Sequence, residues 1–168
     1  IALMESAMRS APEDTASHLA LADLYVDAGR EPDAVKMLEA ASKKFPKDAD
    51  VLNFLGYLLA ERGERLDEAI RLVTRALQID PDNPSYLDSL GWAHLKRGEL
   101  DQAHKHLARA AEALPTNSVI QDHYGDVLVR IGKPADAVAA WTKALQGDGA
   151  DIDKAAIEKK IINAKGKM

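Results

Sequence analysis

The chain has 168 residues, contains no cysteine and carries a formal charge of −5, with 27 acidic against 22 basic side chains. This length suits one compact domain or a short array of repeated units. The negative charge argues against nonspecific binding to nucleic acid or anionic lipid. The lack of cysteine excludes disulfides and thiol catalysis, and no apolar run approaches the roughly 20 residues that span a bilayer.

Glycine, proline and alanine return along the chain at a stride of 34 or 35 residues. Four sets keep this interval: Gly29, Gly63, Gly98 and Gly132; Pro12, Pro46, Pro81 and Pro115; Ala34, Ala69, Ala103 and Ala137; and Ala41, Ala76, Ala110 and Ala144. Self-similarity at such a period is typical of repeat proteins, in which each unit buries its apolar face against its neighbours.

The stride and its small residues, seen most clearly around the stretch from Leu87 to His94, resemble the tetratricopeptide repeat family. The resemblance implies an all-α fold, a right-handed superhelical α-solenoid of antiparallel helix pairs. It also implies that the leading helix of each pair lines a concave groove.

Taken in chain order, residues 1–149 are predicted to form the repeat array. Residues 1–12 resemble the second helix of a truncated repeat, so the sequence is expected to be a fragment. Four complete repeats are expected at residues 15–48, 49–83, 84–117 and 118–149, with one extra residue lengthening the turn between Gly63 and Ala69. Residues 150–168 are expected to form a capping helix; binding to an acidic partner or a membrane surface is the alternative.

Each leading helix carries an apolar stripe at helical spacing, which in the first repeat consists of His18, Leu21, Ala22 and Tyr25. Later repeats have Gly56, Gly91 and Gly125 where the first has Ala22. Glycine inside a helix costs about 1 kcal/mol relative to alanine. Three glycines at one position therefore indicate that the second helix comes close there.

The opposite side of each leading helix carries a second stripe, which the resemblance places inside the groove. Acidic residues outnumber basic ones in it, and aromatic residues lie near its middle, a composition typical of binding surfaces. We predict a partner-binding groove formed by Asp23, Asp27, Asn53, Tyr57, Glu61, Asp88, Trp92, Lys96, Asp122, Asp126 and Arg130.

The implied ligand is an extended or helical peptide with basic and apolar side chains. Its apolar part would stack on Trp92 while its charge meets Asp88 or Asp126. The alternative is that Phe54, Tyr57 and Trp92 pack between adjacent repeats.

Some tetratricopeptide domains hold the C-terminal carboxylate of a chaperone through lysine, arginine and asparagine side chains. The matching positions in this chain are mostly acidic or apolar: Leu19, Asp23, Phe54, Asp122 and His123. Binding of a chaperone tail is therefore not expected.

The sequence predicts no enzyme, no cofactor and no metal site, because it has no phosphate-binding loop and no nucleophile motif. His104 and His106 lie about 200° apart around a helix, so they cannot share a metal ion and are expected to be solvated. His94 is expected to be a core histidine whose hydrogen bonds are satisfied.

Residues 55–62, residues 87–93, and residues 122–126 with Trp141 resemble the C-terminal repeats of Gram-negative bacterial envelope-associated tetratricopeptide proteins. That resemblance implies a periplasmic or outer-membrane-associated protein; without it, a cytoplasmic location is expected.

The expected function is that of a scaffold or adaptor that binds a peptide segment or a partner protein in the concave groove. The alternative is a structural module that forms homo-oligomers through its repeats. Neither nucleic acid binding nor direct membrane insertion is expected.

Overall fold

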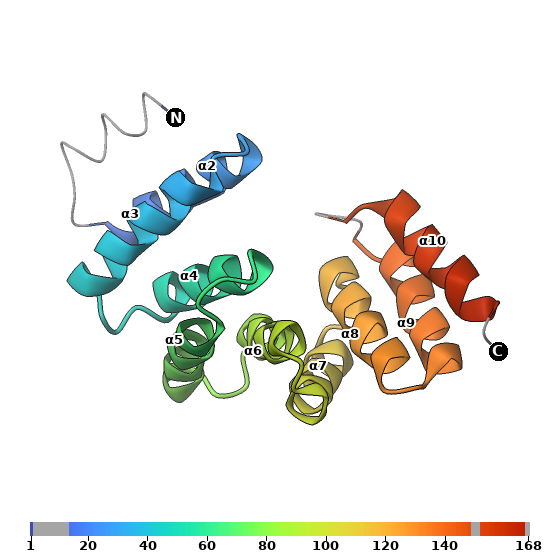
Figure 1. Ribbon diagram of the computed structural model, residues 1–168. Helices are drawn as coiled ribbons and strands as arrows, with labels where there is room; N and C mark the ends of the chain where they lie inside the picture. The colour runs from blue at the N-terminus through green and yellow to red at the C-terminus, as the bar shows by residue number, and fades with distance from the viewer. Residues whose placement is uncertain (2–13, 149–151, 167–168) are drawn as a thin grey trace. The chain divides into compact units, whose positions relative to one another are not determined.

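The computed structural model describes residues 1, 14–148 and 152–166, and the helix expected near the N-terminus falls on residues outside them. The described residues form α-helices without strands and divide into two compact units, at residues 1–81 and 82–168. The first unit contains α2 (Thr15–Asp27), α3 (Glu31–Lys44), α4 (Ala49–Glu61) and α5 (Leu66–Ile79). The second contains α6 (Pro84–Arg97), α7 (Leu100–Ala113), α8 (Ser118–Arg130), α9 (Pro134–Gln146) and α10 (Lys154–Lys165), as Figure 1 shows.

The helices pack in consecutive pairs, α2 with α3, α4 with α5, α6 with α7, and α8 with α9, so each predicted repeat contains one pair. In the second unit α9 also packs against α10, which lies in the segment predicted as a cap (Figure 1). None of the described helices is long and apolar enough to cross a bilayer.

A polar side chain begins each leading helix at a constant place in the repeat. Immediately before α2, α4, α6 and α8, the side-chain oxygens of Asp14, Asp48, Asn83 and Asn117 accept hydrogen bonds from first-turn backbone amides. Each such cap typically contributes about 1 kcal/mol. Asp153 caps α10 in the same way. Thus α10 begins as a leading helix does, although no second helix follows it in the described residues.

The turn within each pair ends the leading helix at a glycine with positive φ. At Gly98 the φ angle is +86°, a conformation in which a Cβ atom would be strained. The extra residue of the second repeat lengthens its turn as predicted, and Arg65 there has a φ of +50°. The Arg65 guanidinium donates to Glu39 of α3 and Glu68 of α5, so the inserted turn is tied to two helices of the first unit.

Close contact within three of the pairs depends on a glycine of the leading helix. A Cβ atom at Gly91 would lie 2.6 Å from Cγ and 3.0 Å from the amide nitrogen of Leu107 on α7. A Cβ at Gly56 would overlap α5, and one at Gly125 would overlap the indole of Trp141 on α9. The predicted close approach at these three positions is confirmed.

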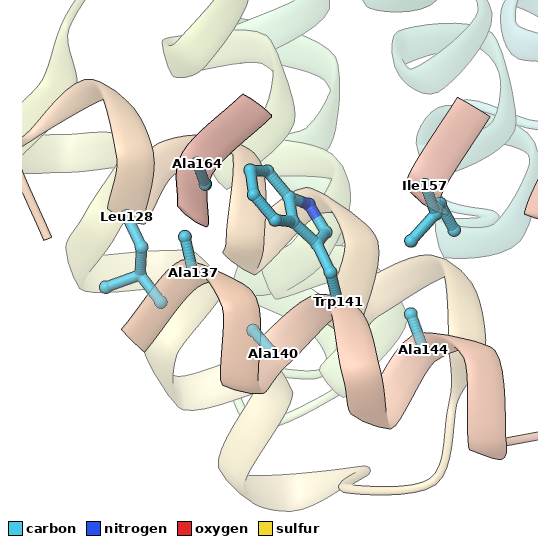
Figure 2. Close-up of a cluster of buried hydrophobic side chains, with 7 residues drawn as sticks. All are labelled: Leu128, Ala137, Ala140, Trp141, Ala144, Ile157 and Ala164. Atoms are coloured by element: carbon cyan, nitrogen blue, oxygen red, sulfur yellow. The ribbon is translucent and has the colours of Figure 1, made fainter. Parts of the chain in front are cut away.

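In the second unit the core reaches from α8 through α9 to α10. Figure 2 shows the indole of Trp141 rising from α9 toward α10, which contributes Ile157 and Ala164. Trp141 is only 2% exposed and shares this cluster with Leu128 of α8. The last helix therefore covers an apolar face of α9 that would otherwise meet water.

Replacing Gly91 with leucine should destabilise the second unit by roughly 1–3 kcal/mol or more, because the new side chain would overlap Leu107. Urea unfolding followed by circular dichroism measures the change. Gly166→Leu is the matched control, since a Cβ at Gly166 has no neighbour closer than 3.8 Å. Equal stability of the Gly91→Leu variant and the original chain would contradict the prediction.

Candidate functional site

In the first unit, the predicted groove residues lie on α2 and α4. Asp23, Asp27 and Glu61 are exposed, whereas Asn53 and Tyr57 are partly buried. The side-chain oxygen of Asn53 is buried and accepts no hydrogen bond in the described part of the chain. The role of these five residues in binding stays a prediction.

In the second unit, a pocket of about 390 Å³ lies between α6, α8 and α10. Its lining residues come from four helices: Trp92, Leu95 and Lys96 from α6; Asp126, Val129 and Arg130 from α8; Trp141 from α9; and Lys160, Asn163 and Ala164 from α10. Four of the predicted groove residues, Trp92, Lys96, Asp126 and Arg130, are thus brought together. The third wall comes from α10, for which the sequence predicted a capping role, with binding to an acidic partner or a membrane surface as the alternative.

Trp92 both packs between repeats and lines the pocket, so the two alternatives drawn from the sequence coexist in one residue. Its partly buried indole stacks on the imidazole of His123 on α8, with ring centroids 4.0 Å apart and planes inclined by 15°. The ammonium of Lys96 lies 4.6 Å from the indole centroid. Cation–π contacts of this kind contribute about 0.5–2 kcal/mol. The indole is therefore held in a defined orientation at the pocket wall.

Asp88 is buried, so the expectation that it offers an exposed charge to a partner is wrong. Its residue is 5% exposed, and both carboxylate oxygens lie 3.0 Å from Nδ1 of the buried His123. Burial lowers the pKa of His123, but the charge of Asp88 and its hydrogen bond outweigh burial and raise the pKa above its ordinary value. Because α6 and α8 pack together, this face of α6 contacts the next repeat, and the ion pair supports the ring on which Trp92 stacks.

Asp122 and Asp126 do not present unpaired negative charge either, because Lys160 of α10 bridges them. The Lys160 ammonium lies 2.8 Å from a carboxylate oxygen of each. Burial lowers the pKa of Lys160, but hydrogen bonds to the two carboxylates outweigh it and raise the pKa. Burial also raises the pKa of Asp122, and the hydrogen bond from Lys160 opposes this. The lysine-rich composition of the last segment was the sequence signal for such a pairing.

The pocket lining therefore carries charges of both signs, whereas the sequence predicted a mainly acidic groove. Lys96, Arg130 and Lys160 line it against one carboxylate, that of Asp126. Arg130 donates from Nη1 to the backbone oxygen of Leu95 at 2.8 Å and forms no salt bridge within the described residues. Pairing with Lys160 of another helix, which a stripe on one helix cannot show, offsets part of the negative charge of Asp122 and Asp126.

Trp141 is one of the pocket residues that sequence reasoning missed, together with those of α10, since it entered only through a resemblance. Its indole Nε1 donates to Oδ1 of Asp126 at 3.2 Å, and the Lys160 ammonium lies 5.9 Å from its ring centroid. Its position in the repeat could have indicated it. Trp141 occupies the position that Val73 and Leu107 hold in the two preceding repeats, and there it replaces an aliphatic side chain with a large indole.

His94 of α6 and His106 of α7 contact each other, which the sequence did not predict. His94 is buried and its Nδ1 lies 2.6 Å from Glu99, which confirms the predicted core histidine. His106 is only partly exposed: its ring stacks on that of His94 with centroids 5.8 Å apart, and burial lowers its pKa to about 4. Over the residues that the structure describes, no group of three or more His, Asp or Glu side chains is arranged to hold a metal ion.

The buried pair of His123 and Asp88 predicts a specific pH dependence of stability. The folded state keeps a proton on His123 that the unfolded state releases near the ordinary histidine pKa of about 6.5. The free energy of unfolding should therefore fall as the pH rises above about 6.5, until the raised pKa is passed.

Asp88→Asn should abolish this fall, because it removes the charge that keeps His123 protonated. Urea unfolding of both proteins between about pH 6 and pH 8.5 measures how the free energy of unfolding changes with pH. The difference between the two pH profiles cancels the contributions of the other histidines. Parallel profiles would show that His123 is not held in its protonated form.

Two family models described as tetratricopeptide repeat match the chain, at residues 2–84 and 59–125. A TPR repeat-containing protein of Pseudomonas aeruginosa is 40% identical over 81 residues, which are 48% of this chain. The match spans 14% of the length of that relative.

Two solved structures are similar in fold. A thermophilic TPR protein of Thermus thermophilus has a TM-score of 0.77 and 21% identity, over 97% of this chain and 87% of that one. PilW, described as a type IV pilus biogenesis factor, has a TM-score of 0.79 and 23% identity, over 98% of this chain and 76% of that one. Together with the repeated helix pairs, these matches show that the chain belongs to the tetratricopeptide repeat family and has its all-α solenoid fold.

Proposed function

We propose that this chain is a protein–protein interaction module that binds a segment of its partner in the pocket between α6, α8 and α10. Tetratricopeptide arrays serve generally as scaffolds for protein interaction, through the extended surfaces that stacked repeats create. The observation that carries the proposal is the pocket itself, because both tryptophans of the chain line it.

The size and composition of the pocket favour a peptide side chain as ligand. Its volume of about 390 Å³ lies at the lower end of the roughly 300–1,000 Å³ typical of ligand pockets. That volume suits one or two side chains. Buried aromatic residues in a desolvated pocket are the usual anchors of protein interfaces, and Trp92 is already oriented by its stacking on His123.

Self-association is the second candidate function. Ile162 of α10 is 68% exposed, an unusual state for an isoleucine on the last described helix. Self-association can be tested by measuring the molar mass of the original chain and of Ile162→Lys by light scattering across a range of concentrations. A mass that rises with concentration only when Ile162 is present would favour assembly through this face.

Peptide binding can be tested with a phage-displayed library of random peptides of about twelve residues. Enriched peptides, labelled with a fluorophore, are titrated by anisotropy into the original chain and into Trp92→Ala. We expect this substitution to weaken binding at least about tenfold, because it removes an aromatic anchor.

A second pair of variants guards against a folding defect in Trp92→Ala. Asn163→Trp places a bulky side chain at an exposed position of the pocket wall and should block binding equally. Lys159→Trp is the matched control, on the same helix but outside the pocket lining, and should bind as the original chain does. Enriched peptides that bind all four proteins equally would show that the pocket is not the binding site.

A further inference from the structure

We propose that a proton on His123 controls the affinity of the pocket for its partner segment, because the protonated ring keeps Trp92 in its binding orientation. His123 does not line the pocket, so it acts on the ligand through Trp92 and is a positioning residue. This inference rests on the proposed function and adds how binding depends on pH. The contacts that carry it join α6 to α8 at the pocket wall.

One face of the Trp92 indole is covered by the imidazole of His123. The ring centroids are 4.0 Å apart and the planes are inclined by 15°, so the two rings lie nearly parallel. Trp92 is partly buried and lines the pocket, whereas His123 is only 6% exposed. A cation is attracted to an aromatic face, and more strongly where water is excluded. A protonated His123 therefore holds the indole more firmly than a neutral one.

The ring of His123 is in turn fixed by Asp88 of α6. Both carboxylate oxygens of Asp88 lie 3.0 Å from Nδ1 of His123, and Asp88 is 5% exposed. No other cation in the part of the chain that the structure describes forms a salt bridge with Asp88. A buried charge that loses its partner is costly. A neutral ring can still donate one hydrogen bond, but it no longer balances the carboxylate, so the support of the indole weakens.

Other charged and titratable groups of the second unit lie near this pair without replacing it. Asp122 and Asp126, on the same helix as His123, share the ammonium of Lys160 from α10. The groups on the remaining helices have other neighbours: His104 of α7 contacts the ring of Tyr124, the charge of Asp136 of α9 acts on Tyr124, and Lys96 of α6 lies 4.6 Å from the Trp92 indole centroid.

Asp88 therefore has the largest influence on whether His123 keeps its proton. Burial lowers the pKa of His123, but the charge of Asp88 and its hydrogen bond, with the charges of Asp122 and Asp126, outweigh burial and raise the pKa.

The sign of the pH dependence follows from these contacts. A partner segment that needs Trp92 in its fixed orientation binds the protonated form more tightly than the neutral form. The affinity should be highest where His123 is protonated and should fall as the pH rises through its raised pKa. By reciprocity, a bound segment should raise the pKa of His123 further.

The protonation of His123 can be followed directly by NMR. The chemical shift of Cε1 in isotope-labelled histidine reports the proton on the ring, and the signal of His123 is the one missing from His123→Gln. The titration runs from about pH 6 to about pH 9. A saturating peptide should move the midpoint upward, which an ion pair with a purely structural role would not show.

The affinity is measured over the same pH range with a pocket-dependent peptide, meaning one that binds the original chain and is lost on Asn163→Trp. The peptide should have blocked termini and contain no histidine, cysteine or tyrosine, so that it does not itself titrate. We expect its dissociation constant to rise at least about threefold, with the same midpoint as the titration of His123, because a less fixed indole binds less tightly.

Two variants test whether the proton acts through this ring. Asp88→Asn combined with His123→Phe keeps an aromatic ring beside Trp92 and removes both charges, so its affinity should not change with pH. His104→Gln, on α7 and outside the pocket lining, is the control and should keep the full pH dependence. Circular dichroism at each pH verifies folding, and the measurements on the original chain need no variant.

The two proposals fail in different ways. A pocket-dependent peptide whose affinity stays flat or rises over the whole pH range, or that leaves the midpoint of His123 unchanged, would overturn this inference and leave the proposed function intact. The same holds if the double variant keeps the pH dependence of the original chain. A library from which no peptide depends on the pocket would overturn the proposed function and the inference together.

Discussion

The close approach of the two helices in each pair is the constraint on which this structure depends. It requires a small residue on the leading helix, which is glycine in three of the four pairs, and a Cβ atom at Gly91 would lie 2.6 Å from Leu107. The repeat interval follows from this requirement, because each unit must bring the same small residue to the same contact. At Gly125 the space is filled by the large indole of Trp141. The contact that shapes the fold thus also supplies a wall of the candidate binding pocket.

The last helix changes the character of the surface that it completes. α10 begins with an aspartate cap, as the leading helices do, and its Lys160 reaches Asp122 and Asp126 on α8. Two acidic residues of one helix thus share one ammonium of another, which offsets part of their negative charge. Arg130 and Lys96 lie beside this contact in the pocket lining, so charges of both signs meet there. A helix predicted to cover an apolar face therefore also supplies part of the charged lining of the pocket.

Periodic features of the fold could be predicted because they depend on local chemistry. The glycines with positive φ, the buried stripes and the close contacts at Gly56, Gly91 and Gly125 all follow from residue type and spacing. The pocket residues could be predicted only in part. Trp92, Lys96, Asp126 and Arg130 lie on the predicted stripe, but Trp141 and Lys160 come from other helices, and their contribution depends on contacts between repeats.

By itself, the sequence determined the all-α repeat architecture, because helical periodicity, glycine turns and small-residue contacts are properties of residues close together in the chain. Only the tertiary structure decided which carboxylates around the candidate site are paired with cations. Asp88 pairs with His123, which lies 35 residues further along, and Asp122 pairs with Lys160, 38 residues further along. A carboxylate attracts a ligand only when no nearer cation neutralises it, and the three-dimensional packing of the helices determines which cation is nearest.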